Sequence, residues 1–323
     1  DSAALLGEVF EATAMSAEKM ALARQRHWKL SSRLMERHGL GNATHVLSVY
    51  GQGRDLLAKA KKSGLKVICD VNIAPSFGAI LQTERQRFPD WEEATLNIDP
   101  GFRDEMLALS DQLLCPSEFV RRDLIEVYGV APERTALVPY AVSAKWLELS
   151  ADPIAGSVLF VGDAGLRKGA PYLLEAADLL AARGRSYEFR LAGNASEAVR
   201  SAADRRICKF LGRVPRAEID KEFARADILV LPSLAEGSAG VTYEALGAGI
   251  PVVTTFESGS VVRDGIDGII IPCRNAHALA EAIDKIVSDR DLRAQMSLNA
   301  RQRASDYTWE RYQQRLVSAI CSA

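Results

Sequence analysis

The amino-acid sequence lacks several features that would place it at once in a well-defined class of protein. No apolar run in its 323 residues approaches the ~20 residues that a membrane-spanning helix needs. The formal net charge of −2 shows no excess of basic residues, so we expect no nucleic-acid partner. No cluster of histidine, aspartate and glutamate suggests a metal site, so we expect no metal. The composition, 48% hydrophobic and 25% charged, is that of a globular protein long enough for two domains.

The cysteines also lack the spacing of a disulfide or zinc framework. None of the five forms a C-x-x-C pair, and four of them lie in or beside apolar runs. They are Cys69, Cys115, Cys208, Cys273 and Cys321. Reduced thiols in the core are therefore the better interpretation. Reduced thiols indicate a cytoplasmic location.

Short apolar runs predict four strands in the first half of the chain, over residues 45–50, 65–71, 112–116 and 136–139. Periodic apolar residues predict helices over residues 55–62, 102–109 and 118–128, and patchy helical spacing covers residues 1–41. The stretch between residues 71 and 102 is interpreted as a loop leading to the second of these helices. Four strands would make a thin sheet for a first domain.

The second half alternates strand and helix more regularly. Strands are predicted over residues 157–161, 187–192, 207–211, 227–231, 251–255 and 268–271. Helices are predicted over residues 170–183, 217–224, 276–288, 292–304 and 309–320, the last with Thr308 as its N-cap. This alternation favours a parallel sheet covered on both faces, which binds ligands beyond the carboxyl ends of its strands.

Residues 226–255 form the most informative stretch, a β-α-β unit with two carboxylates. Glu236 lies in the loop after the first strand, and Glu244 lies eight residues later on the helix. The small residues of the loop would let a ligand approach the backbone closely, and the start of the helix offers N–H groups that suit a phosphate. These small residues are Gly237, Ser238, Ala239 and Gly240. A ligand with a central diphosphate and hydroxyl-bearing sugars at both ends matches this pattern, since carboxylates accept hydrogen bonds from hydroxyls.

This stretch resembles the signature of the GT-B retaining glycosyltransferases of family four, also called group 1. The family's motif is Glu, seven residues, Glu, and the framing Pro-Ser, Glu-Ala-Leu and Gly-x-Pro-Val-Val sequences are also present. The resemblance implies an α/β fold of two Rossmann-like doubly wound domains facing a cleft, the first one incomplete. It also implies that Glu236 contacts hydroxyls of the transferred sugar and that Glu244 contacts the nucleotide ribose.

The loop from Gly162 to Gly169 resembles the family's diphosphate-binding loop. Lys168 matches the lysine that neutralises the donor diphosphate in that family. Many relatives have an arginine directly after the first glycine, Gly162, where this chain has Asp163, so Arg167 is the candidate to compensate. A solvated basic pair is the alternative. The loop is not a P-loop, because Lys168 is followed by glycine. Gly193 and Gly212 resemble loops that flank the nucleotide base, whose contacts are often made by backbone.

The first half departs from the family pattern at one position near the reacting sugar. Many relatives have a histidine near the end of the strand that corresponds to residues 67–71, and this chain has Asp70 and Asn72 there. Asp70 is a candidate substitute, although an N-cap or turn role stays open. Residues 116–120 and 138–142 resemble the end of the family's first domain. Glu84 and residues 88–91 resemble one subset of the family.

The resemblance implies three parts: an acceptor-side domain over residues 1–142, a donor-binding domain over 143–306, and a helix over 307–323 that crosses back to the first domain. Residues 143–155 are interpreted as the linker. Complete relatives begin with a strand and a glycine-rich loop that faces the acceptor. Neither is recognisable here, so we expect that the sequence lacks its original N-terminus.

The expected function is sugar transfer from a nucleotide-diphosphate sugar, which is a substrate, so no cofactor is expected. The partners would be this donor and a carbohydrate or lipid-linked acceptor. Lipid-linked acceptors in relatives leave peripheral association with the inner face of the membrane open. Two alternatives are a nucleotide-sugar binding protein with little transfer activity and a GT-B sugar-nucleotide epimerase, for which no acid or base residue can be assigned. The side chains do not reveal the base, the sugar or the acceptor.

Overall fold

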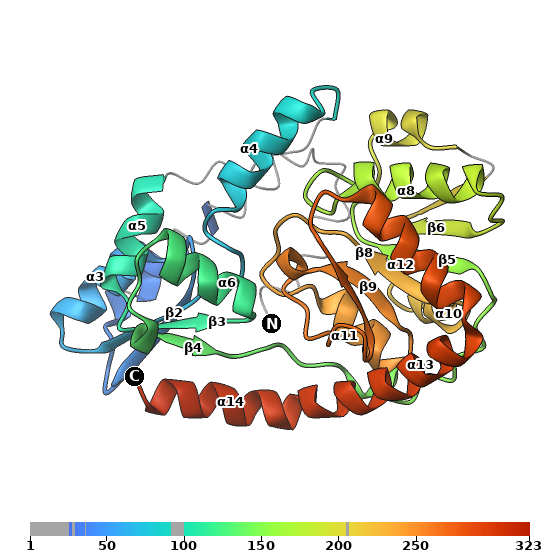
Figure 1. Ribbon diagram of the computed structural model, residues 1–323. Coiled ribbons are helices and arrows are strands. Elements are labelled where there is room, and N and C mark those ends of the chain that lie inside the picture. Colours follow the sequence, from blue (N-terminus) through green and yellow to red (C-terminus); the bar gives the residue numbers. More distant parts are fainter. Residues whose placement is uncertain (1–25, 28–29, 36, 92–99, 205–206) are drawn as a thin grey trace. The chain divides into compact units, whose positions relative to one another are not determined.

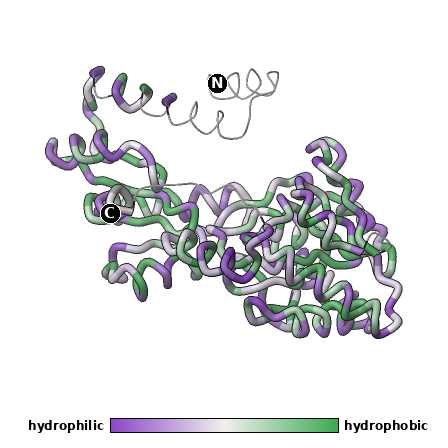
Figure 2. Tube along the Cα trace, turned by 90° about the horizontal axis from the view of Figure 1, so that it is seen from above, coloured by the Kyte–Doolittle hydropathy of each residue, from purple (hydrophilic) through white to green (hydrophobic). Residues whose placement is uncertain are grey.

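The computed structural model describes residues 26–27, 30–35, 37–91, 100–204 and 207–323 (Figure 1). The chain divides into two compact units, one over residues 1–70 and 98–112 and the other over 71–97 and 113–323. Most of the helix predicted within residues 1–41 lies outside the described residues, although residues 30–35 are helical. In Figure 2 hydrophobic and hydrophilic stretches alternate along the chain, in keeping with elements that bury one face.

The smaller unit contains the parallel strands β1 (His45–Val49) and β2 (Lys66–Asp70), with Val46 opposite Val67. Helices α3 (Arg54–Lys62) and α5 (Pro100–Leu109) accompany them. The middle of β2 is fully buried, and α3 buries Leu56, Leu57 and Ala60, which share one helix face. Both strands and both helices confirm the sequence prediction.

The larger unit is built on a six-stranded parallel sheet in the order β10-β9-β8-β5-β6-β7. The strands confirm the six predicted runs to within one residue at each end. They are β5 (Ser157–Val161), β6 (Glu188–Ala192), β7 (Cys208–Gly212), β8 (Ile228–Leu231), β9 (Val252–Thr255) and β10 (Gly268–Ile271). The same unit holds the parallel pair of β4 (Thr135–Leu137) with β3 (Gln112–Cys115).

Helices cover both faces of the six-stranded sheet, as predicted. Val158 and Phe160 of β5 pack in one apolar cluster with α8 (Ala170–Ala182) and α12 (Ala276–Ser288). Leu159, which points to the opposite face, packs in a second cluster with α11 (Gly240–Gly247) and α13 (Arg290–Ala304).

The remaining helical segments are shorter, apart from the last. They are α6 (Glu118–Arg122), the π-helix η1 (Asp123–Val127), the 3₁₀ turns η2 (Pro132–Arg134), η3 (Phe256–Ser258) and η4 (Ser305–Tyr307), and helices α9 (Glu197–Ala202), α10 (Ile219–Ala224) and α14 (Trp309–Cys321). Thr308 caps α14 as predicted, because its side chain accepts a hydrogen bond from the Arg311 N–H. No helix in the described part of the chain is both long and apolar enough to cross a membrane.

Two interpretations of the sequence were wrong. The supposed loop after residue 71 contains helix α4 (Phe77–Arg87), which buries Phe77, Leu81 and Glu84. A buried glutamate in the apolar series hides its helical period. The supposed linker over residues 143–155 contains helix α7 (Ala144–Leu147), whose Trp146 is only 2% exposed. The predicted domain boundaries at residues 142/143 and 306/307 do not coincide with the compact units and remain predictions.

Candidate functional site

The predicted ligand-binding loops follow the carboxyl ends of β5 and β8, which are neighbours in the sheet although three helices and two strands separate them along the chain. This is the point where the strand order reverses direction. Parallel sheets bind ligands in the crevice at such a switch point, because the loops on its two sides diverge there. Residues 162–169 follow β5, and residues 232–239 follow β8.

Three glycines predicted to line the site are brought together by backbone packing. The Gly193 N–H donates to the Gly212 carbonyl over 2.8 Å. Gly162 and Gly193 have φ angles of 140° and 143°, and a Cβ atom on Gly193 would overlap the Gly162 carbonyl. Glycine is therefore needed here for the close approach of the β5 and β6 loops. Whether these glycines also contact a nucleotide stays a prediction.

Glu236 forms ion pairs with both predicted phosphate-binding cations. Its Oε1 lies 2.6 Å from the Lys168 Nζ, and its Oε2 lies 2.5 Å from the Arg167 Nη1. The side chains of Glu236 and Lys168 are 11% and 13% exposed, whereas that of Arg167 is 29% exposed. The Ser233 hydroxyl also donates to Oε1 over 3.3 Å. The sequence predicted that these three side chains share a ligand, but it did not predict that they contact one another.

The Lys168 side chain lies directly above Gly162. A Cβ atom on Gly162 would come within 3.2 Å of the Lys168 Cε. Glycine at this position leaves room for the lysine stem, which the loop then directs toward Glu236. The pairing of Gly162 with Lys168 in the predicted motif therefore has a structural reason.

The backbone of the Glu236 loop is held by the turn η3 after β9. The Glu236 N–H donates to the Glu257 carbonyl and the Ala239 N–H to the Ser258 carbonyl, both over 3.0 Å. The Ser238 hydroxyl donates to the Gly259 carbonyl over 2.7 Å. Ser238 and Ala239 are thus buried packing residues in this structure, and their predicted contact with a ligand stays a prediction. Sequence analysis missed the η3 turn, which has no motif of its own.

Two glycines of the loop have different surroundings. A Cβ atom on Gly237 would overlap the carbonyl oxygen of Asn72, and the Ser117 hydroxyl donates to the Gly237 carbonyl over 2.5 Å. Gly240, the first residue of α11, is exposed, and a Cβ atom there would meet no atom within 4 Å. Gly237 is therefore required by packing, whereas packing does not require glycine at position 240, where contact with a ligand stays a prediction.

Glu244 lies on α11, half-buried beside the short helix α7. Burial raises the pKa of its carboxyl above the usual value, against the lowering effects of Arg216, Lys145 and a hydrogen bond with the Trp146 side chain. The Trp146 ring packs on Phe223 at a centroid distance of 4.5 Å. Trp146 is a residue that sequence analysis missed as a partner of Glu244, because it lies in the supposed linker.

Asp70 belongs to the smaller compact unit, where it ends strand β2. Its backbone carbonyl accepts a hydrogen bond from the Tyr50 N–H over 2.8 Å. Burial raises the pKa of its carboxyl to about 6. A carboxyl with a raised pKa is a reasonable candidate for proton transfer, and its role near the reacting sugar stays a prediction.

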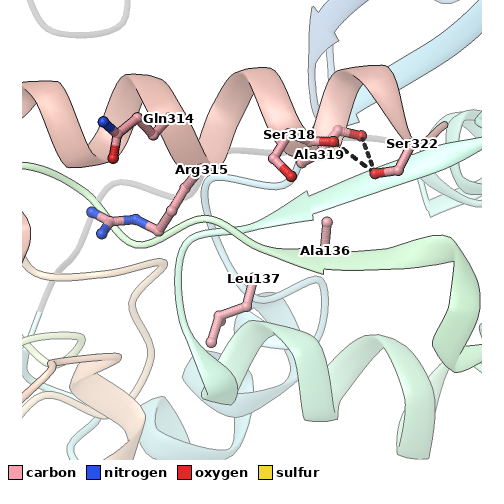
Figure 3. Close-up of a pocket in the computed structure, with 7 residues that line it drawn as sticks. All are labelled: Ala136, Leu137, Gln314, Arg315, Ser318, Ala319 and Ser322. Carbon is pink, nitrogen blue, oxygen red and sulfur yellow. Dashed lines mark hydrogen bonds between the residues drawn. The ribbon is translucent and has the colours of Figure 1, made fainter.

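Within the described residues, no group of three or more His, Cys, Asp or Glu side chains is arranged to hold a metal ion. A shallow pocket of about 450 Å³ lies elsewhere, between β4 and α14 (Figure 3). Its lining residues are Ala136, Leu137, Gln314, Arg315, Ser318, Ala319 and Ser322, none of which belongs to the loops described above.

Comparison with known proteins identifies relatives of the larger unit. Residues 155–303 match the family described as "Glycosyl transferases group 1". This part of the chain is therefore similar to the group 1 glycosyl transferase domain. The matched residues include the loops that follow β5, β6 and β8, with Glu236, and helix α11, with Glu244. A D-inositol 3-phosphate glycosyltransferase of Geodermatophilus obscurus is 30% identical over 247 residues, which cover 68% of this chain and 54% of that protein. The chain spans about half the length of the curated relatives it matches.

Solved structures confirm the GT-B fold. Sucrose-phosphate synthase from Thermosynechococcus elongatus has a TM-score of 0.67 at 18% identity, over 96% of this chain and 80% of that one. HepE of Anabaena, in complex with UDP and glucose, has a TM-score of 0.65 at 17% identity, over 87% of this chain and 78% of that one. At these identities the likeness establishes the fold alone.

Proposed function

We propose that the protein is a retaining glycosyltransferase that moves a sugar from a nucleoside-diphosphate sugar to a hydroxyl acceptor. The convergence of Arg167, Lys168 and Glu236 at the switch point of a group 1 domain is the observation that supports this most strongly. Two adjacent cations can neutralise a diphosphate, and a carboxylate between them can accept hydrogen bonds from sugar hydroxyls. Retention of the anomeric configuration rests on the resemblance of the motif to family four.

The donor would lie along the β5 and β8 loops. Lys168 and Arg167 would bind the diphosphate, and the exposed start of α11 at Gly240 would direct its N–H groups toward the same phosphates. Glu236 would orient the sugar, and Glu244 would accept hydrogen bonds from the ribose hydroxyls. As the bond to the sugar breaks, negative charge grows on the leaving diphosphate, and Lys168 would stabilise it.

The acceptor is proposed as a hydroxyl of a carbohydrate or of a lipid-linked carbohydrate. Several curated relatives carry the name D-inositol 3-phosphate glycosyltransferase, so a phosphorylated inositol is the first acceptor to test. HepE, which shares the fold, has been solved with UDP and glucose, so UDP-glucose is the first donor. We propose a cytoplasmic location. We also propose that the nucleotide sugar is a substrate and that the reaction needs no further cofactor.

The test is incubation with UDP-, GDP- and ADP-sugars and a panel of acceptors, followed by mass spectrometry of the products. A mass increase of one sugar on an acceptor supports the proposal, and NMR of the new anomeric centre tests retention. Binding of a donor without transfer or hydrolysis would favour a nucleotide-sugar binding protein. Conversion of the donor into an isomeric nucleotide sugar without acceptor would favour an epimerase.

A further inference from the structure

The two cations that would bind a diphosphate are already paired with a carboxylate. Glu236 contacts Lys168 at 2.6 Å and Arg167 at 2.5 Å, one oxygen to each cation. All three side chains are mostly shielded from water, so these charge-assisted hydrogen bonds are stronger than surface ion pairs. A diphosphate that binds the same donor groups of Arg167 and Lys168 must therefore displace the Glu236 carboxylate.

A carboxylate and a phosphate require the same geometry from these donors. Each presents two oxygens that accept hydrogen bonds from an ammonium group and from the edge of a guanidinium group. Arg167 and Lys168 are adjacent in the chain and direct their charges to one place, so a single oxyanion can hold both. Among the described residues, the other side chain that contacts the Glu236 carboxylate is the neutral Ser233 hydroxyl, so no second pair of cations is present there.

We infer that Glu236 and the donor diphosphate compete for Arg167 and Lys168, so that donor binding exchanges one oxyanion for the other. The inference rests on the proposed function. The exchange releases the Glu236 carboxylate at the moment when the sugar hydroxyls arrive, and those hydroxyls become its new partners. A nucleoside diphosphate that lacks the transferred sugar supplies no such hydroxyls. Its binding therefore leaves the shielded Glu236 carboxylate poorly paired, which reduces the affinity.

The exchange has a consequence for the reaction cycle. After transfer, the nucleoside diphosphate product no longer carries the sugar that partners Glu236. The carboxylate can then return to Lys168 and Arg167 and displace the product. Glu236 would thus weaken product binding selectively while it contributes to binding of the intact donor. The same side chain would thus orient the donor sugar before transfer and compete with the product diphosphate for Lys168 and Arg167 after it.

The test is calorimetric titration of UDP, GDP and ADP into the wild type, Glu236→Gln and Glu175→Gln. Glu236→Gln removes the competing charge, so the nucleoside diphosphate that binds should bind about 10- to 100-fold more tightly, the value of one charge-assisted hydrogen bond. Glu175→Gln is the matched control. It removes one carboxylate charge in the same way, but Glu175 is exposed on α8 outside the proposed site, so this variant should change affinity by less than about threefold.

Two further measurements keep the test decisive. Glu236→Ala retains the hydrogen bond from the backbone N–H of residue 236 to the Glu257 carbonyl. It should tighten product binding as Glu236→Gln does, and agreement of the two variants shows that the effect does not come from the glutamine side chain. The free nucleoside has no phosphate and should bind all variants equally. Equal or weaker binding of the diphosphate by both Glu236 variants would overturn the inference and leave the proposed function intact. No binding of any nucleoside diphosphate, even to wild type, would overturn the proposed function and the inference with it.

Discussion

The Arg274 Nε donates to the fully buried Oε2 of Glu84 over 2.6 Å, although the two residues lie 190 positions apart. The Tyr172 hydroxyl donates to the other oxygen of the same carboxylate. Glu84 comes from helix α4, Tyr172 from α8 and Arg274 from the turn after β10. A single glutamate thus holds α4 against α8 and the turn after β10.

Removal of the arginine partner should destabilise the protein. Arg274→Met leaves the Glu84 carboxylate buried with the Tyr172 hydroxyl as its one good partner. Loss of one partner of a buried ion pair costs about 3–5 kcal/mol. Because Arg274 is partly exposed, we expect the free energy of unfolding to fall by about 2–3 kcal/mol. Arg274 has a φ of 61°, and methionine has the same Cβ atom, so the backbone strain is unchanged. Urea unfolding measures the difference.

The control for this variant is Arg185→Met. Arg185 pairs with Asp284 at 2.8 Å, but its side chain is 43% exposed, so its removal should destabilise the protein much less than Arg274→Met does. Equal losses in the two variants would show that burial of Glu84 does not set the strength of the Arg274 contact.

Lys168 should be the more important of the two cations for turnover. Lys168→Ala should lower kcat about 10²- to 10³-fold if the ammonium acts like one preorganised donor at the leaving diphosphate. Arg167→Ala should lower it less, because Arg167 is more exposed and its charge is better screened by water. Steady-state kinetics with a saturating donor measure both values. An unchanged kcat in Lys168→Ala would contradict the role given to the lysine.

The raised pKa of Glu244 predicts how nucleotide binding depends on pH. The Glu244 carboxyl would accept hydrogen bonds from both ribose hydroxyls most strongly when it is ionised, and burial raises its pKa above the ordinary 4.5. Affinity should therefore be full above this raised pKa and should fall as the pH drops through it, at a higher pH than a solvated glutamate would give. Calorimetric titration between pH 4 and 8 measures the midpoint.

Two variants identify the group responsible for that pH dependence. Glu244→Gln should flatten the profile, because the amide does not titrate in this range. Trp146→Phe should move the midpoint to higher pH, since the hydrogen bond with Trp146 lowers the pKa of Glu244, while the phenyl ring keeps much of the packing on Phe223. A midpoint that is the same in wild type and Trp146→Phe would contradict the contact between Trp146 and Glu244.

Two glycines of one loop should respond oppositely to alanine. Gly237→Ala places a methyl group on the Asn72 carbonyl and should destabilise the protein by several kcal/mol, on the order of other overpacked sites. Gly240→Ala meets no atom and should leave the melting temperature unchanged or slightly raised. It should nevertheless weaken nucleotide binding if the diphosphate approaches the start of α11. Full nucleotide affinity in a folded Gly240→Ala protein would contradict that approach.

The sequence predicted the six-stranded sheet well because parallel strands buried on both faces are continuous apolar runs with glycine or proline beside them. Strand β10 was predicted to its last residue. The sequence also predicted the loops that carry Lys168 and Glu236, because the spacing of these residues and the residues that frame them form a recognisable motif.

The errors have three different physical causes. Helix α4 was missed because Glu84 occupies a buried position, and its partners Tyr172 and Arg274 are distant in sequence. Trp146 was assigned to a linker because four residues of helix are too few to show a period. The ion pairs of Glu236 with Lys168 and Arg167 could not be predicted either, because a motif specifies which residues meet a ligand but not which residues meet one another.

The most direct measurement of the central claim is a thermal-shift panel with UDP, GDP, ADP and their common sugars on wild type, Glu244→Ala and Glu175→Ala. Only ligands that prefer the native state raise its melting temperature. Glu175 is exposed on α8, outside the proposed site, and serves as the control for loss of a carboxylate. We expect stabilisation by the nucleotides of one base, weakened in Glu244→Ala and unchanged in Glu175→Ala. No stabilisation by any nucleotide, or the same stabilisation in Glu244→Ala as in wild type, would contradict a nucleotide-sugar site at this loop.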